Sequence, residues 1–93
     1  QTSFNESRVR AYPNPVRPDY QGYIRIDGLM MDSQVKITDS YGSLIHEGTS
    51  IGGSFSWNGQ NSQGQRVASG VYHVMATDEN GQEGIVTKII MIK

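Results

Sequence analysis

The candidate general bases of a hydrolase are two histidines, His46 and His73. A hydrolase needs a nucleophile, a base and an orienting group that meet in one pocket. Neither histidine stands in a recognisable catalytic motif, and solvated side chains on strands are the simpler interpretation of both. The sequence has no cysteine, which excludes thiol catalysis and cysteine-ligated metals. We therefore expect a protein that is not an enzyme.

Acidic and amide side chains gather in two places where they could bind calcium. One place is residues 78–80, which read D-E-N, and the other is Asn58 with Asn61. A calcium loop of the EF-hand type needs ligands at alternate positions and a glutamate at the twelfth, and neither segment has that order. Turn formation explains both groups, so we expect no metal and no cofactor.

Exposed aromatic side chains could form a platform for sugars, and the candidates are Tyr12, Tyr20, Tyr23, Tyr41 and Trp57. No acidic or amide side chain stands beside them at a position that would indicate sugar binding. We therefore expect Trp57 in the core and the tyrosines at the surface or at strand edges. A carbohydrate-binding module remains a minor alternative.

The elements that position these residues centre on residues 57–72, which read W-N-G-Q-N-S-Q-G-Q-R-V-A-S-G-V-Y. Asn58-Gly59 is a turn signal, and a polar loop with Gly64 separates two strands. If Trp57 and Tyr72 both point inward, they fix the register, because a slip of one residue would turn both toward water.

Alternating apolar residues predict about seven strands, and valine and isoleucine far outnumber leucine and alanine. No segment has the spacing of three and four residues that is typical of a helix. The pattern predicts an all-β, immunoglobulin-like antiparallel β-sandwich, with a small barrel as the alternative. The predicted strands cover residues 9–12, 23–27, 34–39, 43–47, 54–57, 70–77 and 84–92.

The last predicted strand departs from a simple alternation, because both of its faces are apolar from Ile89 onward. A strand with one wet face should alternate. One interpretation is that this strand is central in its sheet or that a loop covers its outer face. The other is that it binds a protein, by packing or by strand addition, which would also permit an oligomer.

Length and charge restrict the remaining function classes. A chain of 93 residues has room for one domain, and its net charge of −1 gives no basis for a nucleic-acid partner. No apolar run approaches the roughly 18 residues that cross a bilayer, so we expect no membrane insertion. We expect residues 1–8 to be a linker to an upstream domain and residues 9–93 to be the folded domain.

Four motifs in order resemble the C-terminal sorting domain of type IX secretion substrates of Bacteroidota. They are Y-P-N-P at residues 12–15, D-S-Y-G at 39–42, the tryptophan-glycine series at 57–72 and T-K-I-I-M-I-K at 87–93. The tryptophan-glycine loop is also similar to the Ig-like domain of flagellar hook-capping proteins, where it is structural.

The resemblance implies an Ig-like domain that serves as an address. Such a domain directs an attached cargo across the outer membrane, and its partners are the translocon, shuttle and sortase components of that system. The cargo passes through the periplasm to the outer membrane, the cell surface or the medium, and the domain is either cut off or stays attached. The alternative is a structural Ig-like module of a larger surface protein.

The resemblance also assigns residues. Gly42, Gly64 and Gly81 are its turn glycines, and Gly59 joins them through the Asn58-Gly59 signal. Removal of residues 89–93 is expected to abolish export and to leave the domain folded. The residues assigned to partner recognition are Gly70, Val71, Tyr72, Lys88, Ile89, Ile90, Met91, Ile92 and Lys93.

Overall fold

The computed structural model describes residues 9–20, 22–77 and 81–92. The predicted strands are confirmed, with bounds that differ by one or two residues at an end. The strands are β1 (Arg10–Tyr12), β2 (Ile24–Asp27), β3 (Gln34–Thr38), β4 (Leu44–Thr49), β5 (Phe55–Trp57), β6 (Gly70–Thr77) and β7 (Glu83–Met91).

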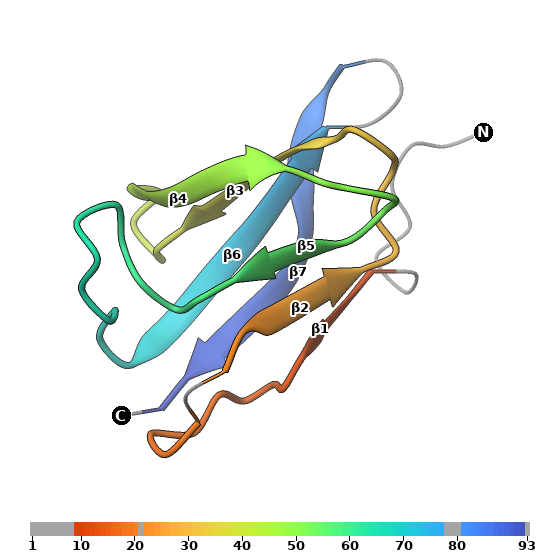
Figure 1. The fold of residues 1–93 in the computed structure, drawn as a ribbon. Coiled ribbons are helices and arrows are strands. Elements are labelled where there is room, and N and C mark those ends of the chain that lie inside the picture. The colour runs from red at the N-terminus through yellow and green to blue at the C-terminus, as the bar shows by residue number, and fades with distance from the viewer. Residues whose placement is uncertain (1–8, 21, 78–80, 93) are drawn as a thin grey trace.

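The strands form two sheets that pack face to face (Figure 1). The smaller sheet has the order β1-β2-β5, and the larger has the order β4-β3-β6-β7. All neighbouring strands within these sheets are antiparallel. The predicted sandwich is therefore confirmed, and the sheets do not join into the alternative barrel.

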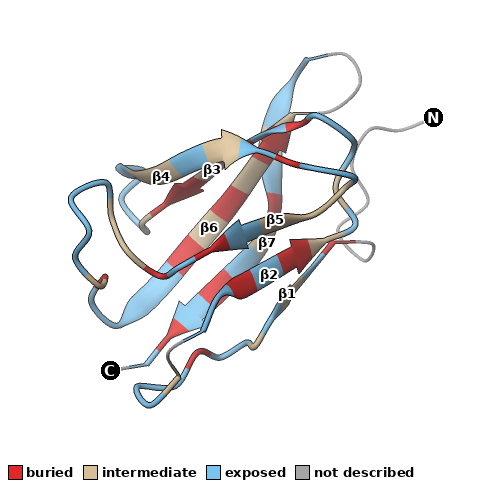
Figure 2. Cartoon of the chain, viewed as in Figure 1, coloured by how far each residue is buried: buried red, intermediate tan, exposed pale blue. Residues whose placement is uncertain are grey.

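Trp57 and Tyr72 point into the space between the sheets, as the sequence predicts. Their exposed fractions are 0% and 6%, and their ring centroids lie 5.9 Å apart. Each also uses its polar atom: the Trp57 indole N–H donates to the Gln60 carbonyl at 2.9 Å and the Tyr72 hydroxyl to the Ala68 carbonyl at 2.7 Å. Buried and half-buried residues then alternate along β6 (Figure 2), so this pair fixes the register of two strands.

Two turns of the described chain share one design. The side-chain oxygen of Asp39 accepts hydrogen bonds from the N–H groups two and four residues later, and the side-chain oxygen of Asn61 does the same. Gly42 and Gly64 follow at the matching position with positive φ angles of 87° and 80°. The sequence pairs residues 39–42 with residues 78–81 instead, and positions 78–80 lie outside the described residues.

Strand β7 contains one irregularity, at Val86. The pairing with β6 runs from Val74 opposite Thr87 to Met75 opposite Ile85, so Val86 is an extra residue on β7. Such a β-bulge shifts the phase of the side chains along its strand. Both Val86 and Ile89 are therefore buried, although they lie three positions apart.

The interpretation of β7 as a central strand is wrong, because β7 forms an edge of the larger sheet. Residues 14–16 run beside this edge, and both peptide bonds that precede Pro13 and Pro15 are cis. The alternative that a loop covers its outer face is also wrong, because Ile85 and Ile90 on that face are each 45% exposed. Residues 14–16 cover only the edge of the strand.

Candidate protein-recognition surface

Strand β7 divides its side chains between the core and the outer face of the larger sheet. Val86, Ile89 and Met91 point inward, with exposed fractions of 3% or less. Ile85, Lys88 and Ile90 point outward and are exposed. The apolar terminal segment of the sequence therefore serves two purposes: one set of its side chains builds the core, and the other set remains at the surface.

The adjacent strand β6 contributes to the same face. Val71 lies directly opposite Ile90 and is 39% exposed, whereas the neighbouring Tyr72 points into the core. Burial raises the pKa of the Tyr72 hydroxyl, and the Asp39 carboxylate adds to this rise. We use the term β6–β7 outer surface for Val71, Ile85, Lys88 and Ile90.

The residues that the resemblance assigns to recognition thus separate into groups. Val71, Lys88 and Ile90 come together on the β6–β7 outer surface. Gly70 is exposed at the start of β6, and Ile92 is exposed directly after the end of β7. Lys93 lies outside the described residues. Those that are buried are Tyr72, Ile89 and Met91.

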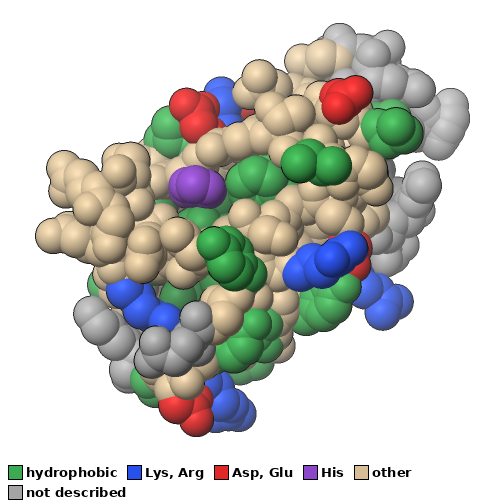
Figure 3. Space-filling model, viewed as in Figure 1, with side chains coloured by type: hydrophobic (Ala, Val, Ile, Leu, Met, Phe, Trp, Pro, Cys, Tyr) green, Lys and Arg blue, Asp and Glu red, His purple; other side chains and the backbone are tan. Residues whose placement is uncertain are grey.

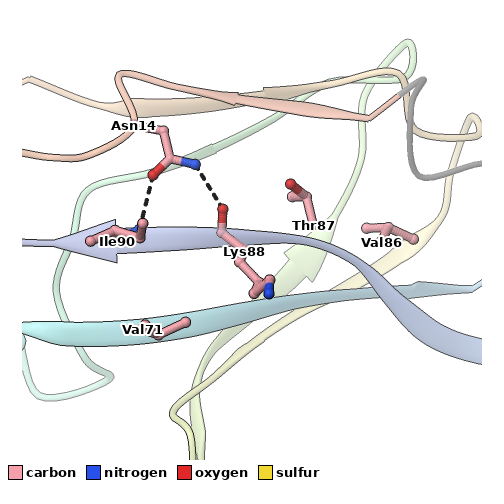
Figure 4. A pocket seen from close by; sticks show the side chains of 6 residues that line it. All are labelled: Asn14, Val71, Val86, Thr87, Lys88 and Ile90. Carbon is pink, nitrogen blue, oxygen red and sulfur yellow. Dashed lines mark hydrogen bonds between the residues drawn. The ribbon is translucent and has the colours of Figure 1, made fainter.

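A hollow of about 380 Å³ opens on this surface (Figure 4). It is lined by Asn14, Val71, Val86, Thr87, Lys88 and Ile90. In Figure 4 the Lys88 side chain extends on the opposite side of β7 from Asn14. Asn14 lies within the Y-P-N-P motif, but the sequence does not assign it to the site, because its contact with β7 joins residues 74 positions apart.

Residues 14–16 occupy the edge of β7 beside this hollow. The Asn14 side chain donates to the Lys88 carbonyl at 2.8 Å and accepts from the Ile90 N–H at 3.0 Å. The Val16 N–H donates to the Ile90 carbonyl at 2.7 Å, and the Val16 carbonyl accepts from the Ile92 N–H at 2.8 Å. We define this contact as the edge clamp. Because the edge groups are already bonded here, a partner strand cannot pair with this stretch unless the clamp is displaced, whereas the outer face is free for packing.

Lys36 and Lys88 lie on the same outer face but in different surroundings. Lys36 forms an ion pair with Glu83 at 2.9 Å, and the pairing register places Glu47 beside it. Hydrogen bonding to Glu83 raises the pKa of Lys36, and the charges of Glu83 and then Glu47 act in the same direction. Lys88 stands opposite His73 and, among the described residues, takes part in no ion pair.

The turn glycines have the backbone that the sequence predicts. The φ angles of Gly42, Gly59, Gly64 and Gly81 lie between 77° and 87°. Gly59 is also buried, and a Cβ there would stand 3.5 Å from the Met91 Cε atom. The loop after Trp57 therefore packs against the inner face of β7.

The opposite outer face, on the smaller sheet, carries a closed polar network. Asp27 accepts hydrogen bonds from Ser54 at 2.6 Å, from the Tyr12 hydroxyl and from Arg25 at 2.8 Å. These bonds, in the order Ser54, Tyr12, Arg25, lower the pKa of Asp27 from 3.8 to about 2. Figure 3 shows this face, where a basic and an acidic side chain touch over β2 and hydrophobic side chains lie in separate groups.

The residues first considered for chemistry have other surroundings. His46 lies against Phe55, with ring centroids 5.8 Å apart, and His73 is half-buried on the outer face of β6. The side-chain oxygens of Asn58 and Asn61 accept hydrogen bonds within their own turns. In the described part of the chain, no three His, Asp or Glu side chains cluster as metal ligands would.

The described residues also contain no helix with the length and apolar character needed to span a membrane.

Known proteins share the fold of this chain and, in one case, part of its sequence. The chain is similar to a domain of PorZ, described as an essential bacterial surface component of the type-IX secretion system of Porphyromonas gingivalis, with 36% identity and a TM-score of 0.82. The match covers 94% of this chain and 12% of the PorZ chain, so the chain spans a small part of that protein. This similarity confirms the predicted resemblance to the type IX secretion family.

A dimeric latent form of PorU from Porphyromonas gingivalis shares the fold, with 19% identity and a TM-score of 0.59 over 90% of this chain and 9% of that chain. No curated protein matches the chain. The family model of the FlgD Ig-like domain matches residues 21–82, the region with the tryptophan-glycine loop. The matched region includes well over half of the 93 residues of the chain. The chain therefore belongs to the FlgD Ig-like domain family.

Proposed function

We propose that this domain directs an attached cargo across the outer membrane through the type IX secretion system and to the cell surface. The observation that carries the proposal is the similarity to PorZ over 94% of the chain at 36% identity. PorZ is a surface component of that system, so a domain so similar in sequence and shape is a reasonable candidate for the same pathway. The partners under this proposal are the translocon, shuttle and sortase components.

In this role the domain acts through its surface and catalyses no reaction. The β6–β7 outer surface offers neighbouring exposed apolar side chains around one lysine, and exposed apolar patches mark protein-binding sites. The edge clamp favours recognition by packing on this face over strand addition at the neighbouring edge.

The test is an export assay with a fusion protein. Residues 9–93 are joined to the C-terminus of a periplasmic reporter in a bacterium with a working type IX system, and surface reporter is measured with an impermeant label. We expect surface labelling in these cells and none in an otherwise identical strain that lacks the translocon. A reporter that stays in the periplasm of both strains would refute the proposal.

Removal of residues 89–93 is a poor control for this assay. The sequence predicts that the shortened domain stays folded, but Ile89 and Met91 are core side chains with exposed fractions of 0% and 3%. Deleting them removes two buried side chains and part of the edge clamp, so lost export could reflect unfolding. Substitution of the outward-pointing Ile90 by Ser separates recognition from stability, because this side chain is 45% exposed.

A structural Ig-like module of a larger surface protein is the second candidate. The match to the FlgD Ig-like domain family over residues 21–82 favours it, because this match includes the tryptophan-glycine loop. Under this alternative, export of the reporter fails while the domain is folded. Ile90→Ser then leaves the location of the parent protein unchanged.

A further inference from the structure

The two lysines on the outer face of the larger sheet give an internal comparison. Lys36 and Lys88 are both attached to strands of that sheet, and their side chains leave it on the same side. Lys36 has a carboxylate partner within the chain, Glu83. The cross-strand row of Lys88 contains His73, Thr38 and Leu44, and no acidic residue.

Apolar side chains stand on both sides of Lys88. Ile85 and Ile90 flank it along β7, and Val71 lies across from Ile90 on β6. These three side chains are between 39% and 45% exposed. The pattern along the strand is therefore apolar, cationic, apolar, and a complementary ligand has an acidic group between two apolar ones.

The dimensions fit an extended peptide. In a strand, alternate side chains share a face and each residue adds about 3.3 Å, so three same-face side chains span roughly 13 Å. Ile85 and Ile90 are separated by five positions, one of which is used by the bulge at Val86. The two isoleucines thus stand about as far apart as the first and fifth residues of an extended segment.

We propose that the β6–β7 outer surface binds an extended segment of another protein that presents a carboxylate to Lys88 and apolar side chains to Ile85 and Ile90. This proposal rests on the proposed function and specifies the chemistry of its partner. The bonded edge of β7 requires the segment to lie across the face, with no ladder to the strand.

The first experiment measures binding of a defined probe to the 93-residue chain. The probe is a capped peptide of the sequence Val-Thr-Asp-Thr-Val, compared with the same peptide carrying Asn for Asp, and methyl signals of Val71, Ile85 and Ile90 are followed by NMR. We expect these signals to shift, and the Asn peptide to bind roughly two- to fivefold more weakly, the range for an exposed ion pair. Lys88→Gln should abolish the difference, while Lys36→Gln should preserve it.

Several results would overturn the binding proposal. Equal binding of the two peptides, or no methyl shift with either, would contradict the role of Lys88. Methyl shifts that follow the chain's own concentration without peptide would identify a second copy as the occupant.

The second experiment separates this inference from the proposed function. In the reporter fusion, Lys88→Glu should lower surface labelling several-fold, Lys88→Arg should retain it, and Arg10→Glu on the outer strand of the other sheet should have no effect. If the unmodified fusion is not exported, the proposed function fails. If it is exported and Lys88→Glu is exported equally well, only the inference fails.

Discussion

Strands β2 and β7 present the same kind of inner face and opposite kinds of outer face. Both bury isoleucines between the sheets, with Ile26 and Ile89 each 0% exposed. On the outside, β2 places Arg25 and Asp27 in a network that also includes neighbouring strands. On β7 the exposed cation, Lys88, has apolar neighbours and no ion-pair partner among the described residues.

The two outer faces use charged side chains differently. On the smaller sheet the charges hold strands together, whereas on β7 a charged side chain remains available to a partner. Asp27 receives bonds from β1, β2 and the residue before β5, so its network ties all three strands of the smaller sheet together. The Lys88 side chain takes part in no ion pair within the described chain. A charged side chain without a partner in the fold is available to a binding partner of opposite charge.

The largest expected effect concerns the inner faces, where the two strands should behave alike. Ile26→Ala and Ile89→Ala should each lower the free energy of unfolding by about 2–5 kcal/mol, because each leaves a cavity in a closely packed core. Urea unfolding measures both values. Ile90→Ala is the matched control on the outer face and should cost much less; equal costs for Ile89 and Ile90 would show that β7 has no free face.

The second effect concerns the edge clamp. Asn14→Ala removes two side-chain bonds to β7 and should cost about 1–2 kcal/mol of unfolding free energy. It also exposes unpaired edge groups, so we expect self-association at high concentration, which sedimentation would detect.

Asn58→Ala is the control for the clamp, because the amide of Asn58 bonds only to Gln60 within its own turn in the described structure. If both variants stay monomeric and equally stable, the clamp does not protect the edge.

Local pattern was sufficient to predict the fold. Trp57 and Tyr72 bracket one loop at the ends of two predicted strands, and the structure confirms that both point inward. Turn residues such as Asp39 and Gly42 also act within a few positions of each other.

The site could be predicted only in part. The outward phase of Lys88 depends on the bulge at Val86, which arises from pairing with β6 and leaves no mark in the sequence of β7. Asn14 reaches Lys88 across 74 positions, and no local signal announces such a contact. The sequence therefore located the terminal strand and could not tell which of its side chains remain available.

The third effect concerns the polar network around Asp27, which should weaken at low pH. Because the pKa of Asp27 is lowered from 3.8 to about 2, its contribution to stability is complete above pH 3.8 and is lost as the pH falls toward 2. Asp27→Asn should be less stable than the unmodified chain at neutral pH, and this difference should shrink between about pH 4 and pH 2. Urea unfolding across this range measures it, and a difference that stays constant would show that the network does not hold the carboxylate in its charged form.

The smallest effect is the most informative about the surface. Lys36→Gln should lower the free energy of unfolding slightly, because it breaks the ion pair with Glu83. The raised pKa of Lys36 keeps its ammonium group charged below 10.5, so the lysine is fully charged at neutral pH, and high salt should reduce the contribution of the pair. Lys88→Gln should leave the free energy of unfolding unchanged at both salt concentrations, since the described chain gives Lys88 no acidic partner. Equal losses for the two lysines would mean that Lys88 already has a carboxylate partner in the fold, and a lysine with such a partner has no need of one from another protein.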